Sequence, residues 1–237
     1  MQHDLTCLFL TVNRVPWMRF HNKKMLEAIG DYPLITISRE PMDLPGIQMR
    51  QDGEQSHHNM FKHMLRGAKM AKTDYIGLIE DDILYSDDHF HLRPSLDAVG
   101  FNWNRWSLFT FGEPTYSFKR RICGGASILP RQLLIDALEE RFAKHPNGIP
   151  HYLNGEIGYD IVDKNLGVTV RKSQILYSST PVVQIHHIYG TPGMSHAAKQ
   201  GDAVEHEKRA TRKRMGMKRA YDIPHWGKSA ELIKHFV

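Results

Sequence analysis

The sequence predicts a single α/β domain in which a mainly parallel sheet is flanked by helices. Two observations predict it. Short apolar runs alternate with segments whose apolar residues recur at three- and four-residue spacing, the pattern of strands alternating with helices. One run, residues 75–79, is apolar throughout and ends at three successive carboxylates, as a central parallel strand does where it emerges at its carboxyl end. The 237 residues, with 41% hydrophobic and 24% charged side chains, suit one folded domain.

The first elements of this alternation lie before residue 54. Residues 5–12 form a predicted buried strand, and a helix is expected to follow Pro16 and to end at Gly30. Residues 34–38 form a second short predicted strand. The Pro- and Gly-rich stretch at residues 41–53 then predicts a loop that crosses to the next helix.

The second helix is expected to begin after Ser56, because serine favours helix N-caps. Its apolar stripe is typical of a helix packed on a sheet and consists of Met60, Met64, Ala68 and Ala71. The strand at residues 75–79 follows. Later elements are expected at residues 106–111, after Arg121, at residues 131–143 and at residues 156–166. We divide the chain into a domain at residues 1–194 and a peripheral helical tail at residues 195–237.

Composition also excludes several classes of protein. The longest apolar runs fall far short of the roughly 18 residues of a membrane-spanning helix, so we expect no membrane span. The amino terminus lacks the basic start and small-residue cleavage site of a signal peptide. Cys7 and Cys123 are too few for a disulfide scaffold, so the expected location is the cytoplasm. No pattern indicates an oligomeric state.

Three adjacent carboxylates follow the strand at residues 75–79. Glu80, Asp81 and Asp82 repel one another at a buried strand end unless a cation or hydrogen bonds compensate them. Mg²⁺ and Mn²⁺ bind one or two protein carboxylates and fill their other positions with phosphate oxygens and water, which suits a diphosphate ligand. The alternative is a solvated acidic turn. The buried strand before the carboxylates favours the metal site.

Residues 59–82 carry a resemblance to a known family. Their helix, strand and acidic motif, which reads Gly77-Leu78-Ile79-Glu80-Asp81-Asp82, resemble the nucleotide-sugar domain of the GT-A glycosyltransferases, whose fold is Rossmann-like. The resemblance implies a metal-dependent transfer of a sugar from a nucleotide diphosphate sugar, with a UDP-sugar as the expected donor, to an acceptor hydroxyl. It implies that Asp82, with Glu80 as a second candidate, contacts Mn²⁺ or Mg²⁺. Glu80 or Asp81 would contact the donor ribose or sugar.

Two later segments extend the resemblance. The stretch around Gly124 and Gly125 resembles the small-residue segment beside the donor sugar and acceptor, where the backbone must approach a ligand closely. Its alternative is a tight turn or bulge. The segment from Glu156 to Asp160 resembles the acidic segment under the acceptor site of inverting members, which makes Asp160, or else Glu156, the candidate general base. The alternative is an acidic helix start that the helix dipole favours.

Other candidate ligands come from the ends of two predicted strands. Asn13 and Arg14, directly after the first strand, occupy the place where this family meets the nucleotide, and Arg14 is a candidate phosphate ligand or a surface arginine. His186 and His187 follow an apolar run, and some family members complete their metal site with such a histidine. Side chains alternate between the faces of a strand, so at most one of the two is expected to reach the metal. Trp103 and Trp106 are expected in the core rather than against a sugar or base.

The acceptor has to be inferred from charge. The chain has a formal net charge of +5, and its basic tail includes four closely spaced cations, Arg209, Arg212, Lys213 and Arg214. A small basic enzyme of this kind is similar to the bacteriophage-type DNA glycosyltransferases, which modify hydroxymethylated pyrimidines; the location would then be the host cytoplasm. The tail would bind the DNA backbone. The alternatives are a saccharide or lipid-linked saccharide acceptor, and a non-catalytic nucleic-acid-binding protein whose acidic loop is merely solvated.

Overall fold

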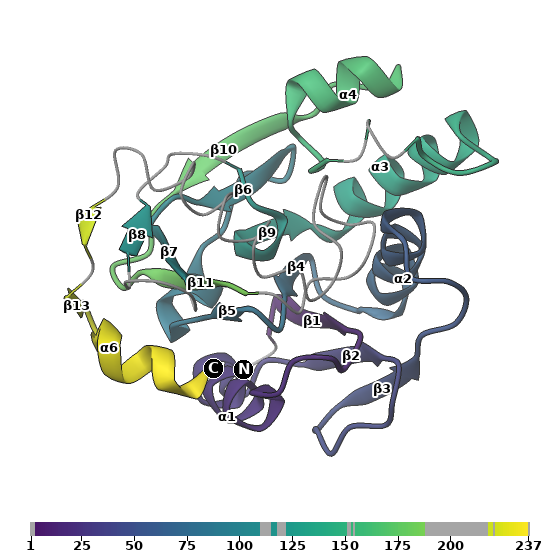
Figure 1. Cartoon of the computed structure of the whole chain (residues 1–237). Helices are drawn as coiled ribbons and strands as arrows, with labels where there is room; N and C mark the ends of the chain where they lie inside the picture. The colour runs from purple at the N-terminus through teal and green to yellow at the C-terminus, as the bar shows by residue number, and fades with distance from the viewer. Residues whose placement is uncertain are drawn as a thin grey trace.

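A seven-stranded sheet forms the centre of the molecule (Figure 1). The computed structural model describes residues 3–109, 115–117, 122–150, 153, 155–187, 218–219 and 221–236. In sheet order, the strands are β10 (Lys172–Leu176), β6 (Ala98–Asn102), β9 (Ser127–Pro130), β4 (Tyr75–Ile79), β1 (Leu5–Thr11), β2 (Leu34–Ser38) and β3 (Ile47–Arg50). Only β9 runs antiparallel to its neighbours. The predicted mixed, mainly parallel sheet is therefore confirmed.

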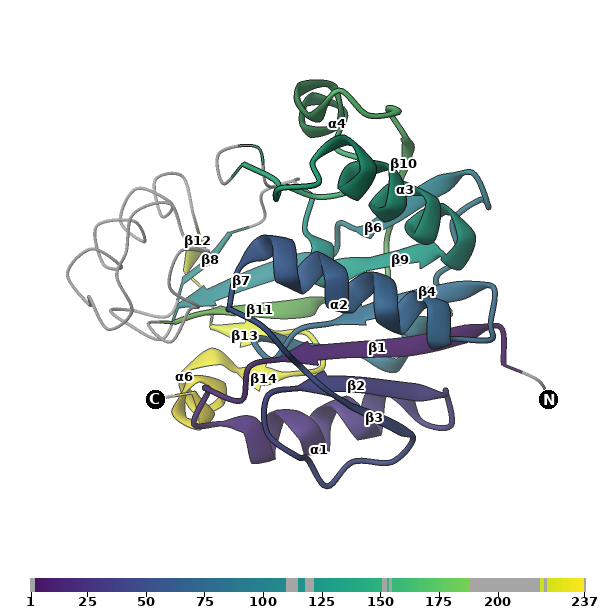
Figure 2. The same ribbon diagram turned by 90° about the vertical axis from the view of Figure 1, so that its right-hand side faces the viewer.

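Helices cover both faces of this sheet (Figure 2). On one face, α2 (His57–Met70) and α3 (Arg131–Lys144) pack against the strands, and α4 (Asp160–Leu166) lies beyond α3. On the other face, α1 (Met18–Ile29) buries Met25, Ala28 and Ile29 against the sheet. Burial of these apolar faces removes hydrocarbon from water and holds the layers together. The predicted flanking helices are also confirmed.

A second, five-stranded sheet lies beside the acidic motif. Its order is β12 (Lys218–Arg219), β8 (Thr115–Ser117), β7 (Arg105–Phe109), β11 (Val182–His186) and β5 (Ile83–Leu84). Because β5 starts directly after Asp82, its antiparallel pairing with β11 fixes the end of the acidic motif. This pairing brings His187, one residue beyond β11, to the same region.

The carboxyl-terminal segment packs on the body of the protein. Residues 195–217 of the expected tail lie outside the described residues. In the described part, a small hairpin of β13 (Asp222–Ile223) and β14 (Gly227–Lys228) leads into α6 (Ser229–Leu232) and a 3-10 turn at Ile233–His235. Ile223, Leu232 and Phe236 are buried in one cluster with Trp17. In the described part of the chain, no helix is long and apolar enough to span a bilayer.

Some element boundaries differ from those expected, for identifiable reasons. The stretch at residues 41–53 contains β3, and β10 was not expected; both are short edge strands whose side chains are mostly exposed, and each has only two apolar residues, so neither stands out as a buried apolar run. The helix expected near residues 156–166 begins only at Asp160. Gly158, with a φ of +80°, has a backbone conformation that residues in a helix do not adopt. Glu156 therefore lies in a loop.

Candidate functional site

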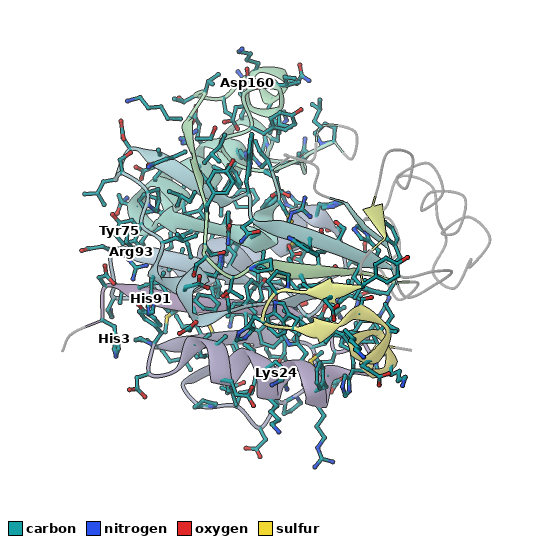
Figure 3. All side chains as sticks on the ribbon, turned by 90° about the vertical axis from the view of Figure 1, so that its left-hand side faces the viewer. His3, Lys24, Tyr75, His91, Arg93 and Asp160 are labelled. Atoms are coloured by element: carbon teal, nitrogen blue, oxygen red, sulfur yellow. The ribbon has the colours of Figure 1, made fainter. Side chains whose placement is uncertain are left out.

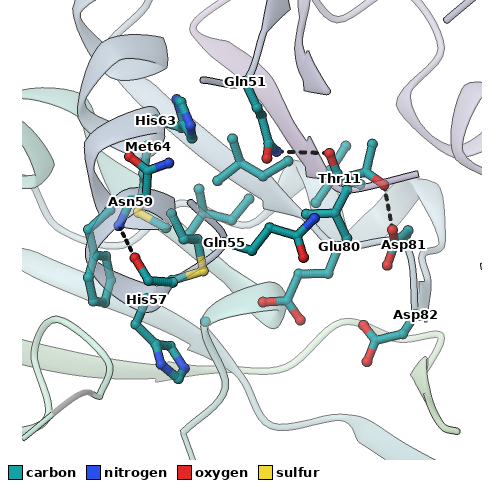
Figure 4. A pocket seen from close by; sticks show the side chains of 18 of the residues that line it. Thr11, Gln51, Gln55, His57, Asn59, His63, Met64, Glu80, Asp81 and Asp82 are labelled. Atoms are coloured by element: carbon teal, nitrogen blue, oxygen red, sulfur yellow. Dashed lines mark hydrogen bonds between the residues drawn. The ribbon is translucent and has the colours of Figure 1, made fainter. Parts of the chain in front are cut away.

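A cavity of about 500 Å³ opens at the carboxyl ends of β1 and β4. Its walls come from the end of β1, the loop before α2, the first turns of α2, the acidic motif and the loop that carries Glu156. Figure 4 shows the carboxylates of Glu80 and Asp82 at one end of this pocket and side chains of α2, including Asn59 and His63, at the other. Ligands of open α/β sheets bind at this edge of the strands.

Asp81 is held by the end of β1. The parallel pairing of β1 with β4 brings Thr11 beside the acidic motif, and the Thr11 hydroxyl donates a 2.5 Å hydrogen bond to Oδ2 of Asp81. The Trp17 indole donates to the Asp81 carbonyl at 2.9 Å. The Gln51 amide donates to the Thr11 carbonyl at 2.8 Å, which ties the loop before α2 to the same point (Figure 4). Burial raises the pKa of Asp81, and the Thr11 hydrogen bond opposes this rise.

Asp82 lies between the two sheets. Its carbonyl accepts a 2.7 Å hydrogen bond from the Ile185 amide of β11, and its Oδ2 lies 3.9 Å from Nε2 of His187. Its Oδ1 is buried and has no hydrogen-bond partner among the described residues. Burial, and next the charge of Asp81, raise the pKa of Asp82 to about 7, while a hydrogen bond from the Gln184 side chain lowers it.

Glu80 packs against the glycine pair. Its amide donates to the Tyr85 hydroxyl at 3.0 Å, and that hydroxyl donates to the Gly125 carbonyl at 2.7 Å. A Cβ atom on Gly125 would lie 2.5 Å from Cδ of Glu80, so only glycine leaves room for this carboxylate. Burial raises the pKa of Glu80 well above its usual range, and the charges of Asp82 and Glu156 raise it further.

Glu156 faces the same pocket from the loop before α4. Gly124 lies directly against its carboxylate, and a Cβ atom there would collide with Oε2. Burial raises the pKa of Glu156, and a hydrogen bond from the Gly124 backbone opposes the rise. The glycine pair thus accommodates two carboxylates, Glu80 on Gly125 and Glu156 on Gly124. With Asp81, Asp82 and Glu54, five acidic residues line this cavity.

Asp160, the other candidate base, does not line this pocket. Its side chain is exposed and pairs with Lys164 one helical turn later at 3.0 Å. Hydrogen bonding to Lys164 lowers the pKa of Asp160, which makes it a weaker base. Figure 3 shows Asp160, the first residue of α4, at the top edge of the molecule. The structure therefore brings Glu156, and not Asp160, to the acidic cluster.

Of the remaining predicted ligands, one member of each neighbouring pair lines the pocket and the other does not. Arg14 lines the pocket, whereas the Asn13 side chain accepts a 3.0 Å hydrogen bond from the Glu40 amide and pins the loop after β1. His187 lines the pocket, whereas His186 stacks on Phe109 with ring centroids 4.6 Å apart.

Two other predictions concern tryptophans and the tail. Trp103 and Trp106 pack against two separate clusters of the core, as expected. The four candidate nucleic-acid ligands lie outside the described residues; they are Arg209, Arg212, Lys213 and Arg214.

Sequence reasoning missed two buried arginines near the pocket. Arg105, at the start of β7, is 5% exposed and donates to Oε1 of Gln184. Its charge lowers the pKa of Glu80, of Asp82 and of Glu156, so it partly offsets their mutual repulsion. Arg141, on α3, is 1% exposed and bonds the loop that carries Glu156. Arg141 continues the apolar stripe of Leu134 and Leu138, which was the available signal that it is buried.

The acidic residues do not by themselves complete a metal site. Within the described ranges, no group of three or more His, Cys, Asp or Glu side chains is arranged to hold a metal ion. The donors that lie close together are Asp82 and His187, with Glu80 in the same pocket. A cation bound here would take its remaining ligands from water or from the bound molecule.

Comparison with known proteins gives likenesses of fold only. No family model matches the chain, and no curated protein matches it. Among solved structures, a fragment of TarS from S. aureus in complex with UDP-GlcNAc is 10% identical with a TM-score of 0.47, covering 90% of this chain and 67% of that one. The mannosyltransferase PcManGT from Pyrobaculum calidifontis, in complex with GDP-Man and Mn²⁺, is 12% identical with a TM-score of 0.46; the match covers 88% of this chain but 64% of that one. A glycosyltransferase involved in glycosylation of the major capsid of PBCV-1 is 11% identical with a TM-score of 0.44, covering 88% and 100%.

Proposed function

We propose that this chain is a metal-dependent glycosyltransferase that moves a sugar from a nucleotide diphosphate sugar to an acceptor hydroxyl. The observation that carries the proposal is the convergence of Glu80, Asp82 and Glu156 on one cavity at the carboxyl ends of β1 and β4. A cavity of about 500 Å³ is within the usual range for pockets that hold small molecules and cofactors. Buried carboxylates that raise one another's pKa repel one another when ionised, and binding of a cation or a proton relieves that repulsion.

The residues present fit a divalent metal. Oδ1 of Asp82 is buried without a partner in the described part of the chain, and an unpaired buried carboxylate oxygen is costly unless a cation contacts it. Asp82 would hold the ion, with His187 and Glu80 as the nearest further donors. Carboxylate, phosphate and water oxygens are the ligands that suit Mn²⁺ and Mg²⁺, and Asp82 and Glu80 supply the protein carboxylates. When bound, the metal would supply Lewis-acid stabilisation of the departing diphosphate.

Glu156 is the general base of this proposal. The acceptor oxygen forms its bond to the anomeric carbon while the bond from that carbon to the diphosphate breaks, and the hydroxyl proton passes to the Glu156 carboxylate. A raised pKa makes Glu156 a better proton acceptor near neutral pH than an ordinary carboxylate. Attack by the acceptor itself inverts the anomeric centre. Arg14 lines the pocket where it could pair with a donor phosphate.

Donor binding tests this proposal before any acceptor is known. Calorimetric titration with UDP-sugars and GDP-sugars is expected to show Mn²⁺-dependent binding that Asp82→Ala removes. Asp97→Ala is the matched control, because Asp97 is an exposed carboxylate whose pKa is lowered by Lys172 rather than raised. Equal binding by Asp82→Ala and wild type, or binding that EDTA does not change, would exclude the metal site. Absence of binding with every donor would favour the non-catalytic alternative.

For the acceptor, we favour a hydroxymethylated pyrimidine base in DNA over a saccharide. The support is the basic charge of the sequence after residue 195, since clustered Lys and Arg gain affinity for DNA phosphates by releasing counterions. Mass spectrometry of nucleosides should show a hexose or pentose increment after incubation of hydroxymethylated DNA with enzyme, donor and Mn²⁺. Donor turnover without such an increment would point to a saccharide or lipid-linked saccharide.

A further inference from the structure

A buried arginine on α3 contacts the loop that carries Glu156. The Arg141 side chain is 1% exposed, and its guanidinium makes three hydrogen bonds to acceptors from that loop and from α4. It donates to the Gly155 carbonyl at 2.9 Å, to the Glu156 carbonyl at 3.1 Å and to Oδ1 of Asp163 at 2.8 Å. The planar guanidinium donates from separate nitrogens in a rigid fork, so Nη1 can bind one acceptor while Nη2 binds the other two.

Asp163 extends the same clamp to the other end of the loop. Its side chain is 1% exposed, and its Oδ2 accepts from the Gly158 and Arg171 amides, each at 3.3 Å. The loop is closely packed as well, because a Cβ atom on Gly155 would lie 2.6 Å from Cγ2 of Val162. Both sides of Glu156 are therefore anchored to α3 and α4, although Glu156 lies in no regular element.

We infer that Arg141 is a positioning residue: together with Asp163 it fixes the loop at residues 155–158 so that the Glu156 carboxylate faces the pocket before a ligand binds. The inference rests on the proposed function of Glu156 as the base. Arg141 itself does not line the pocket, so it acts through Glu156 and not on a substrate. Its guanidinium lies 5.5 Å from the ring centre of Phe61, a pocket residue on α2, which restrains it further.

The same region offers a matched control. Arg171 pairs with Glu140 of α3 at 2.7 Å and is 12% exposed at the side chain, so it too is a largely buried arginine that ties the segment after α4 to α3. Its guanidinium donates to the Thr169 carbonyl and the Glu140 carboxylate, rather than to the carbonyls of residues 155 and 156 that Arg141 binds. Arg171→Lys therefore tests the cost of weakening an arginine pair beside α3 without disturbing Glu156.

The experiment compares Arg141→Lys with Arg171→Lys in two backgrounds, wild type and Glu156→Gln. Lysine keeps the charge opposite Asp163 but donates from a single nitrogen, so it cannot reproduce the two-nitrogen fork that binds both loop carbonyls and Asp163. Arg141→Lys should lower kcat by about 10- to 100-fold, as misplacement of a reacting group does, and leave the KM for the donor within about twofold. In the Glu156→Gln background the same change should have an effect of less than about twofold, because both substitutions remove one function. Arg171→Lys should leave kcat unchanged in both backgrounds.

Hydrogen exchange gives a readout that does not need turnover. The peptide covering residues 155–162 should lose amide protection in Arg141→Lys and keep it in Arg171→Lys. Unchanged protection in Arg141→Lys, or an equal loss of kcat in both backgrounds, would overturn the inference even if transfer is established. If wild type transfers no sugar, the proposed function fails, and the exchange data alone decide whether Arg141 orders the loop. Should Arg141→Lys not fold, Asp163→Asn tests the same clamp and should show a smaller change in the same direction.

Discussion

Replacing Asp82 with asparagine should raise the stability of the metal-free protein. The pKa of Asp82 rises from 3.8 to about 7 on folding, because burial and the charge of Asp81 disfavour the ionised form. A carboxyl whose folded pKa is raised binds its proton more tightly in the native state. Its contribution to stability is therefore fully present below about pH 4 and is lost as the pH rises to about 7.

The size of the gain follows from the shift. A rise of about 3 units corresponds to roughly 4 kcal/mol if Asp82 were isolated and fully buried. Its side chain is 21% exposed and it interacts with Asp81, so we expect about 1–2 kcal/mol at pH 8. Urea unfolding in EDTA should show Asp82→Asn more stable than wild type at pH 8 and equal to it at pH 4. Asp97→Asn, which removes an exposed carboxylate with a lowered pKa, should show no such gain.

Mn²⁺ should make wild type more stable than Asp82→Asn, the reverse of their order in EDTA at pH 8. Wild type should gain about 2.7 kcal/mol when Mn²⁺ is present at 100 times its dissociation constant, and Asp82→Asn should gain little. The reasoning would be refuted if Asp82→Asn were less stable than wild type in EDTA at pH 8, or if Mn²⁺ stabilised the two proteins equally.

Three further predictions concern residues that support the fold and site. Gly125→Ala should lower stability by about 1–3 kcal/mol and weaken Mn²⁺ binding, because its Cβ would displace Glu80; calorimetry measures both effects. Burial holds the pKa of His89 at about 3, so its contribution to stability is lost as the pH falls from about 6.5 to 3. In His89→Phe, the free energy of unfolding measured in urea should therefore fall less steeply over this pH range. Phe236→Ala should lower the free energy of unfolding by about 3 kcal/mol. It should also weaken Mn²⁺ binding, because Trp17, whose ring centre lies 5.3 Å from that of Phe236, donates to the Asp81 carbonyl. Thermal unfolding with and without Mn²⁺ measures both effects.

The local parts of the fold and site were predictable from sequence. The apolar strand before Glu80 and the carboxylates after it lie next to each other in the chain, so their pattern already places a charged cluster at a strand end. Ser56 caps α2 as predicted, accepting a hydrogen bond from the Asn59 amide at 3.1 Å. These features depend on neighbouring residues only, which is why a single sequence reveals them.

The tertiary parts were not predictable in the same way. Glu156 and Asp160 are both acidic and close in sequence, and only the packing of Glu156 on Gly124 separates them. The flanking glycines, Gly155 and Gly158, were the signal that Glu156 precedes the helix. Arg105 is the one charged residue of β7, and its proximity to the acidic cluster arises from the pairing of β7 with β11, which no local pattern encodes.

The most direct test of the central claim is release of nucleoside diphosphate from a panel of nucleotide sugars, measured for wild type, Asp82→Ala and Glu156→Gln with Mn²⁺ or EDTA. The account predicts release by wild type in Mn²⁺, loss of release in EDTA and in Asp82→Ala, and retained donor binding but slow release in Glu156→Gln. Release that persists in EDTA and in Asp82→Ala would contradict it.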